Sequence, residues 1–142
     1  MTPTIAEFLA RVAAVYALVV WAGGIFHLTF AAIPEASRLD SGLRLKVIAG
    51  MMRRYNPFAW TALPVLLVAT SYLALFKTGL TLVPIITLLA VAASFTLDFI
   101  HSFIYGPRAV RGDGAARRKA LTLAWAETLM VFALPPLVAT LL

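Results

Sequence analysis

Four long apolar runs, separated by short polar segments, make up most of the sequence. They extend over residues 12–33, 57–76, 80–104 and 120–142. As helices that rise about 1.5 Å per residue, all of them can cross a hydrocarbon core of roughly 30 Å. The runs are too long for barrel strands, and apolar and polar residues do not alternate along them. The pattern therefore predicts an all-α integral membrane protein, built as an antiparallel up-down bundle of four transmembrane helices.

The boundaries of these runs predict one transmembrane domain and mark its helices. The domain covers residues 1–142, with helices at about 5–33, 57–76, 80–105 and 119–142 and loops at 34–56 and 106–118. Thr4 and Glu7 have the spacing of a capping box, which indicates a helix start. Over 42–55, apolar residues recur at every fourth position, as in an interfacial helix or an inward extension of the second transmembrane helix. Asn56 and Pro57 are expected to restart that helix.

The basic residues are concentrated in two segments, which predicts the orientation. The first segment holds Arg38, Arg44, Lys46, Arg53 and Arg54, and the second holds Arg108, Arg111, Arg117, Arg118 and Lys119. Because cytoplasmic loops carry the excess of lysine and arginine, both segments are expected in the cytoplasm. The chain is therefore predicted to be a multi-pass plasma-membrane protein with both termini on the non-cytoplasmic side.

The composition agrees with a lipid environment and narrows the chemistry. Of the 142 residues, 62% are hydrophobic and 13% are charged, unlike the balance of a soluble domain. The net charge of +6 comes from segments that adjoin the membrane, so the lipid bilayer is the expected partner and nucleic acid is not. The absence of cysteine excludes disulfides, thiolate metal sites and covalent haem attachment.

Four ionisable side chains lie deep within the apolar runs: His27, Asp98, His101 and Glu127. Such groups are costly in a bilayer, so they usually face the bundle interior and serve a function. Counted from the nearest charged segment, all of them are expected roughly 10 to 15 Å inside the membrane. This common depth, reached from three different helices, predicts a shared site.

Two imidazoles at one level could supply both axial ligands of haem b, so His27 and His101 are the candidate haem and metal ligands. Asp98 and Glu127 are the candidate catalytic groups, which would tune the cofactor or relay protons. Further candidates for cofactor binding are Gly23, Gly24, Tyr105, Arg53, Arg54 and Arg108. The glycines leave a patch that suits either a flat macrocycle or close helix packing. The arginines could pair with haem propionates.

The same residues leave other interpretations open. Two imidazoles and two carboxylates could hold a non-haem iron, manganese or zinc ion, or one carboxylate could orient a ligand histidine. The groups could also move protons or metal ions across the membrane. In the plainest interpretation they only hydrogen-bond across helices, as in a structural subunit of a membrane complex.

Several short motifs resemble those of a known family. They are VWAGGIF at 20–26, Pro34 before a basic loop, Arg53-Arg54, and Gly106-Pro107-Arg108. These motifs are similar to the four-helix membrane domain of the CopD copper-resistance family and to the related HemJ-type protoporphyrinogen oxidases. The resemblance implies an up-down four-helix bundle, with haem b and porphyrinogen oxidation on the HemJ side and copper handling on the CopD side. The chain departs from the HemJ pattern at Ala14, where a histidine would be expected.

These observations predict a small cytochrome b-like membrane protein that transfers electrons or protons with a quinol or another membrane redox partner. If the protein is an enzyme, we expect a haem-dependent membrane oxidoreductase. A transporter of copper, another metal or protons is the alternative, and a structural subunit is the second alternative. A homo-oligomer is compatible with all of these functions.

Overall fold

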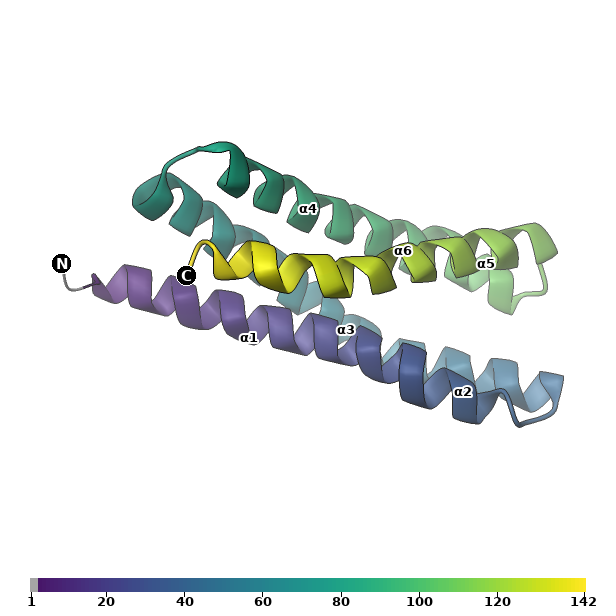
Figure 1. Cartoon of the computed structure of the whole chain (residues 1–142). Helices are drawn as coiled ribbons and strands as arrows, with labels where there is room; N and C mark the ends of the chain where they lie inside the picture. The colour runs from purple at the N-terminus through teal and green to yellow at the C-terminus, as the bar shows by residue number, and fades with distance from the viewer. Residues whose placement is uncertain (1–2) are drawn as a thin grey trace.

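Residues 3–142, the part of the chain that the computed structural model describes, form four antiparallel helical rods joined by short connections. Figure 1 shows both termini at the same end of the bundle as the turn between the second and third rods. Each rod is long and apolar enough to cross a membrane, so the chain is a multi-pass membrane protein. The predicted up-down four-helix bundle is confirmed, and residues 1 and 2 of the predicted domain lie outside the described part.

The rods are composed as follows. The first contains α1 (Ile5–His27), the π-helical segment η1 (Leu28–Ala32) and α2 (Ile33–Ala36), and the second contains α3 (Ser41–Leu73) and the π-helical segment η2 (Ala74–Thr78). The third contains α4 (Leu82–Phe99), the π-helical segment η3 (Ile100–Tyr105) and α5 (Gly106–Val110), and the fourth is α6 (Gly114–Ala139). We call the end where α2 meets α3 and α5 meets α6 the basic end, because the two basic segments lie there.

The helices reach further at the basic end than the sequence predicted. Residues 42–55 continue into the second membrane helix as part of α3, so the inward extension is confirmed. Pro57 lies inside α3 rather than at a restart, and most of the predicted loop 106–118 is helical. A single proline removes only one helical hydrogen bond, and the leucines, methionines and basic residues of this stretch are strong helix formers. The local helix preference therefore outweighs the proline.

Side-chain caps explain where the helices begin. Asp40 accepts hydrogen bonds from two main-chain N–H groups in the first turn of α3, and Asp113 does the same in α6 at 2.9 and 3.0 Å. Thr4 accepts from the N–H of Glu7 at 3.1 Å, which confirms the predicted start of the first helix. At the opposite end, the Lys77 ammonium donates to the last main-chain carbonyls beyond α6, at 3.0 and 2.6 Å. This contact ties η2 to the fourth rod.

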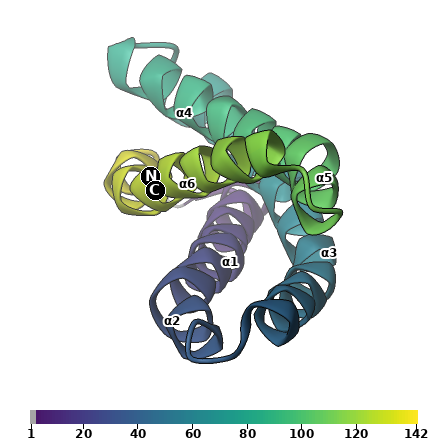
Figure 2. The same cartoon turned by 90° about the vertical axis from the view of Figure 1, so that its right-hand side faces the viewer.

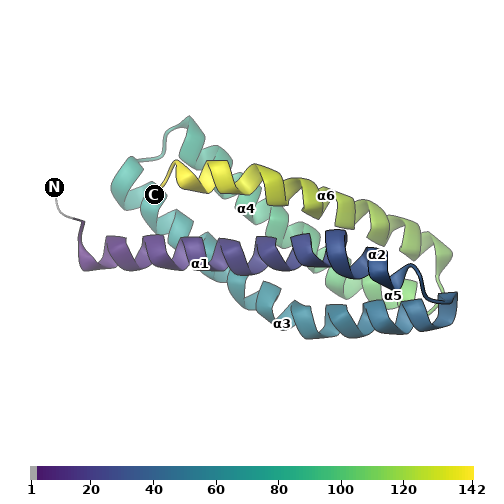
Figure 3. The same ribbon diagram turned by 60° about the horizontal axis from the view of Figure 1, so that its bottom comes forward.

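The rods contact one another in the cyclic order α1, α3, α4, α6, and α6 closes the ring against α1. Figure 3 shows α1 passing between α3 and α6. The α1–α3 interface is built on small side chains, including the fully buried Ala14 and Ala59, which let the two backbones approach closely. Trp21 fills the centre of this interface. The outward faces of the rods carry large apolar residues, as a lipid environment requires.

The α1–α3 interface predicts a difference between two similar substitutions. Ala14→Leu should destabilise the bundle by about 1–3 kcal/mol, because the larger side chain has no space beside α3. Val12→Leu should have little effect, since Val12 is 50% exposed on the outer face of α1. Unfolding of both variants in mixed micelles with increasing sodium dodecyl sulfate would measure the difference. Equal stability of the two variants would contradict this packing.

The cap of α6 predicts a local pH dependence outside the membrane. The main-chain N–H of Ala116, helped by that of Ala115 and by two nearby arginines, lowers the pKa of the Asp113 carboxyl. Because this pKa is lower in the folded state, the cap stabilises the helix start above about pH 4, the ordinary aspartate pKa. The stabilisation is lost as the pH falls through the lowered pKa.

Hydrogen exchange of the Ala115 and Ala116 amides, corrected for the intrinsic rate, should therefore accelerate below about pH 4. In Asp113→Asn the cap is kept but does not titrate, so this acceleration should be absent. An identical acceleration in both proteins would show that another group controls this helix start.

Candidate functional site

Three of the ionisable groups predicted to share a level come together inside the bundle. Asp98 lies on α4, His101 follows one turn later on η3, and Glu127 faces them from α6. Asp98 and Glu127 are only 2% and 4% exposed, and His101 is partly buried. The depth prediction therefore located a real polar cluster, which we call the Asp98–His101–Glu127 cluster.

His27, the fourth predicted member, is not part of this cluster. The buried face of α1 carries Ala17, Trp21 and Ile25, whereas His27 is exposed on the outer face. A separation of two residues turns a side chain by about 200° around a helix, so Ile25 and His27 point in nearly opposite directions. The expectation that His27 points into the bundle and opposes His101 across one haem is therefore wrong within a single chain.

The four-ligand metal set is also not assembled. Within residues 3–142, no group of three or more histidine, aspartate or glutamate side chains is arranged to hold a metal ion. The exposure of His27 removes one imidazole from the predicted set, and the remaining Asp98, His101 and Glu127 are not arranged around one ion either.

His101 and Glu127 form an interhelical pair with a defined geometry. The Nδ1 atom of His101 lies 3.2 Å from each carboxyl oxygen of Glu127. A carboxylate can only accept, so an ionised Glu127 fixes the tautomer in which Nδ1–H donates and Nε2 keeps a lone pair. Nε2 has no hydrogen-bond partner in residues 3–142 and is not among the fully enclosed polar atoms. The imidazole is thus held at one nitrogen and available at the other.

Asp98 differs from the other two residues of this cluster, which hydrogen-bond to each other. Its Oδ2 atom is enclosed and makes no hydrogen bond within the described chain. The imidazole of His101 and the carboxyl of Glu127 are close enough to interact with it electrostatically. An ionised carboxylate left without a partner in such a place is costly, so Asp98 must share a proton or face a group that binds there.

The π-helical segment η3 places His101 between the cluster and the basic end. π-Helical turns are rare and frequent at functional sites. The segment ends at Gly106, whose N–H donates to the carbonyl of His101. A Cβ atom at position 106 would lie 2.8 Å from that carbonyl oxygen, so the end of the segment requires glycine. This requirement explains the glycine in the Gly106-Pro107-Arg108 motif.

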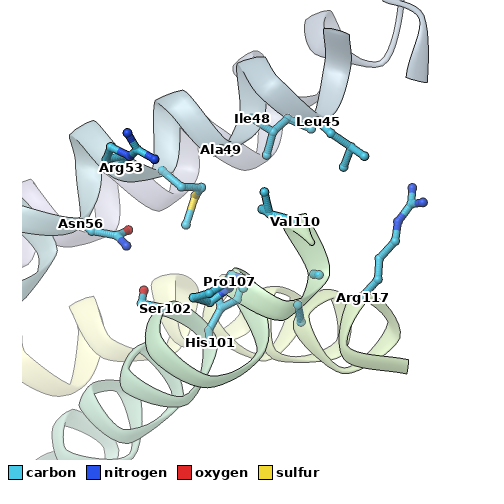
Figure 4. Close-up of a pocket in the computed structure, with 14 residues that line it drawn as sticks. Leu45, Ile48, Ala49, Arg53, Asn56, His101, Ser102, Pro107, Val110 and Arg117 are labelled. Atoms are coloured by element: carbon cyan, nitrogen blue, oxygen red, sulfur yellow. The ribbon is translucent and has the colours of Figure 1, made fainter. Parts of the chain in front are cut away.

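A cavity of about 470 Å³ opens beside His101 at the basic end. Figure 2 shows that at this end α3 lies apart from α5 and α6, and the cavity fills the space between them. Figure 4 shows Arg53 and Asn56 on α3 at one side of it and His101 and Ser102 on η3 at the other. The remaining walls are largely apolar, with Leu45, Ile48, Ala49, Met52, Pro107, Ala109, Val110 and Ala120. Its volume lies within the roughly 300–1,000 Å³ typical of sites for small molecules and cofactors.

The glycine pair has two different environments. A Cβ atom at Gly24 would overlap the ring of Tyr55, whereas one at Gly23 meets no atom within 4 Å. Tyr55 also donates a hydrogen bond of 2.7 Å to the carbonyl of Trp21. Gly24 therefore serves the packing of α1 against α3, and neither glycine lines the cavity.

Of the other residues predicted to bind a cofactor, one lines the cavity and the rest do not. All three arginines are exposed, and of them Arg53 lines the cavity whereas Arg54 and Arg108 do not. Tyr105 packs under the ammonium of Lys119, 5.2 Å from its ring centroid, and also lies outside the cavity.

Sequence reasoning missed three polar residues of the cavity: Asn56, Ser102 and Arg117. Asn56 was interpreted as a helix cap, and Ser102 follows His101 without a motif of its own. Arg117 could have been found, since it belongs to the second basic segment and precedes the apolar run of α6 by one turn. The Oγ atom of Ser102 is enclosed and has no partner within residues 3–142, as is the case for Oδ2 of Asp98.

Between the cluster and the end opposite the basic end, the bundle core is apolar. Its buried hydroxyl groups, on Thr70, Thr87 and Ser94, donate to main-chain carbonyls of their own helices at 2.7 to 2.9 Å. Leu63, Leu66 and several further aliphatic residues fill the rest. Of the cluster, His101 lines the cavity at the basic end, whereas the part of the chain that the structure describes offers no chain of free polar groups to the other side.

No protein-family model, curated protein or solved structure matches this chain. The similarity to the CopD and HemJ families therefore stays a prediction from short motifs, and the function is argued from the site.

The hydrogen bond between His101 and Glu127 predicts a measurable interaction free energy between the two side chains in unfolding experiments. In a double-mutant cycle with His101→Leu and Glu127→Leu, the interaction energy should be about 0.5–2 kcal/mol, as found for interhelical hydrogen bonds in membranes. The matched control is the cycle of His27→Leu with Glu127→Leu, which should give none because His27 faces outward. Unfolding in mixed micelles would measure both cycles. A coupling of the same size in the control would contradict the geometry.

Proposed function

We propose that this protein binds haem b in the cavity at the basic end, with His101 as the one axial ligand that the chain provides, and that it acts in electron transfer within the membrane. The observation that carries the proposal is the environment of the two ring nitrogens of His101. Its Nδ1 is fixed by Glu127, its Nε2 is free, and the ring lines a cavity of about 470 Å³. A ligand histidine in metalloproteins usually has this arrangement, with the second nitrogen bound to a carboxylate or carbonyl group.

The residues of the cavity fit the parts of a haem. Apolar walls from α3 and α5 suit the macrocycle, as in other cofactor sites. Arg53 and Arg117 line the same cavity, and guanidinium groups bind carboxylates such as propionates in two parallel hydrogen bonds. The donor set is therefore one imidazole, two guanidinium groups and an apolar enclosure, which is the chemistry that haem b requires.

Each group of the cluster has a distinct role in this proposal. Glu127 orients the imidazole through Nδ1, so that Nε2 would be left to bind iron. Asp98 holds a proton one helical turn away, where it can balance a change of charge in the cavity. Haem b, when bound, supplies a one-electron couple. A quinol or another membrane redox carrier fits as the partner, because His101 belongs to a membrane-spanning rod and lines the cavity at the basic end.

By the positive-inside rule the basic end is the cytoplasmic end, which places both termini on the non-cytoplasmic side. The arginines of the cavity would then lie at the level of the inner headgroups. The apolar core on the other side of the cluster argues against a continuous route for protons or metal ions, so ligand binding is favoured over transport.

The proposal predicts the colour of the purified protein. Protein from haem-replete cells should contain about one haem per chain by the pyridine hemochromogen assay. Because the chain supplies a single histidine ligand, reduction should give the broad visible band of five-coordinate, high-spin haem. His101→Ala should lose most of this haem, and added imidazole should restore part of the spectrum by occupying the vacated position. The double variant with Arg53→Gln and Arg117→Gln should retain haem poorly, because it lacks both groups proposed to bind the propionates.

The matched control is His27→Ala, which should keep the haem content and the spectrum of the unmodified protein because this imidazole faces away from the cavity. Colourless protein, or equal loss of haem in His27→Ala and His101→Ala, would refute the proposal.

A further inference from the structure

An exposed imidazole within the membrane calls for a partner that the single chain does not supply. His27 lies on the outer face of α1, and residues 3–142 offer it no hydrogen-bond partner. It lies eight residues before Glu35, about 12 Å from that charged position by the helical rise. At this depth a polar side chain that faces lipid is costly, and such groups usually face another helix.

The surface around His27 is shaped for close contact with a helix. Val12, Tyr16, Val19, Gly23 and His27 recur at spacings of three and four residues and form one exposed stripe along α1, which we call the His27 face. A Cβ atom at Gly23 would meet nothing within 4 Å, so this glycine has no packing role inside the chain. Its neighbour Gly24, by contrast, is required by the ring of Tyr55. Gly23 thus leaves a gap on the outside, one turn from the imidazole.

We propose that the His27 face is the contact surface of a homodimer, in which α1 packs against α1 of a second copy in parallel. The two-fold axis is normal to the membrane. The glycine gap allows the two helices to approach closely, and the imidazoles meet at the interface. This interaction is independent of the cavity and of the haem proposal.

The choice of a second copy follows from the depth of the imidazole. Any other helix that covers this face must carry a polar group at the same level, whereas two-fold symmetry guarantees one. A neutral imidazole has one donor and one acceptor nitrogen, so two of them are complementary to each other. Apart from the hydroxyl group of Tyr16, the rest of the face is apolar and offers nothing to a charged partner.

Disulfide trapping tests the contact directly, because the chain contains no cysteine of its own. Val19→Cys replaces a larger exposed side chain of the His27 face, so it introduces a thiol without closing the gap at Gly23. In liposomes, oxidation should convert most of this variant to a covalent dimer. The matched control is Thr96→Cys, which is exposed on α4. Because α4 is on the opposite side of the ring from α1, oxidation of this variant should give no covalent dimer.

A second experiment tests the roles of the two residues. We expect His27→Leu to raise the dissociation constant of the dimer about three- to thirtyfold, the range for one interhelical polar contact in lipid. Gly23→Ile should abolish the dimer by closing the gap. Energy transfer between labelled copies, measured as lipid is added to dilute them, gives the constant. The haem content of both variants should be unchanged, so this test and the haem test can fail separately.

Three outcomes would overturn the homodimer. They are unmodified protein that is monomeric at every lipid ratio, equal cross-linking at positions 19 and 96, and a dimer that neither His27→Leu nor Gly23→Ile weakens. In each case the His27 face would have to be covered by something other than α1 of a second copy.

Discussion

Hydrocarbon offers no hydrogen bonds, and this constraint organises the molecule. The buried hydroxyl groups of Thr70, Thr87 and Ser94 donate to main-chain carbonyls, and Tyr55 donates to the carbonyl of Trp21 at 2.7 Å. Two ionisable groups depart from this pattern. Asp98 is enclosed with a free oxygen one helical turn from His101, and His27 presents its ring to the surroundings. Both groups lie next to a place where we propose that another molecule binds.

The depth of the polar groups could be predicted from sequence, but their direction around each helix could not. Depth follows from the count of residues to the nearest charged segment, so Asp98, His101 and Glu127 were correctly grouped. The direction in which a side chain points around a helix can normally be predicted from a stripe of apolar residues along one face. In α1 no such stripe stands out, because this helix is apolar on every side. Nothing in the sequence therefore distinguished the face of Ile25 from that of His27. The packing of Tyr55 against Gly24 decides it, and this contact joins residues far apart in the chain.

The fold class and the antiparallel order were predictable because they depend on length, hydropathy and short connections alone. The residues at which the helices begin and end were harder to predict. Pro57 and the polar residues of the basic end suggested breaks, but the helices continue through them. The cavity was beyond sequence reasoning. It exists because α3 and α5 lie apart at the basic end, and its polar residues Asn56, Ser102 and Arg117 carry no motif.

The last rod has a consequence for biogenesis. Glu127 on α6 is the partner of His101, Thr128 lies 3.3 Å from Thr29 of the first rod, and the carbonyls that Lys77 reaches follow α6. The ribosome delivers α6 to the translocon after the other three rods, which until then hold their polar groups without these partners. A nascent chain at that stage still lacks the carboxylate that holds His101 and the carbonyls that Lys77 reaches. The site and the tie at the opposite end are thus completed together, by the arrival of a single helix.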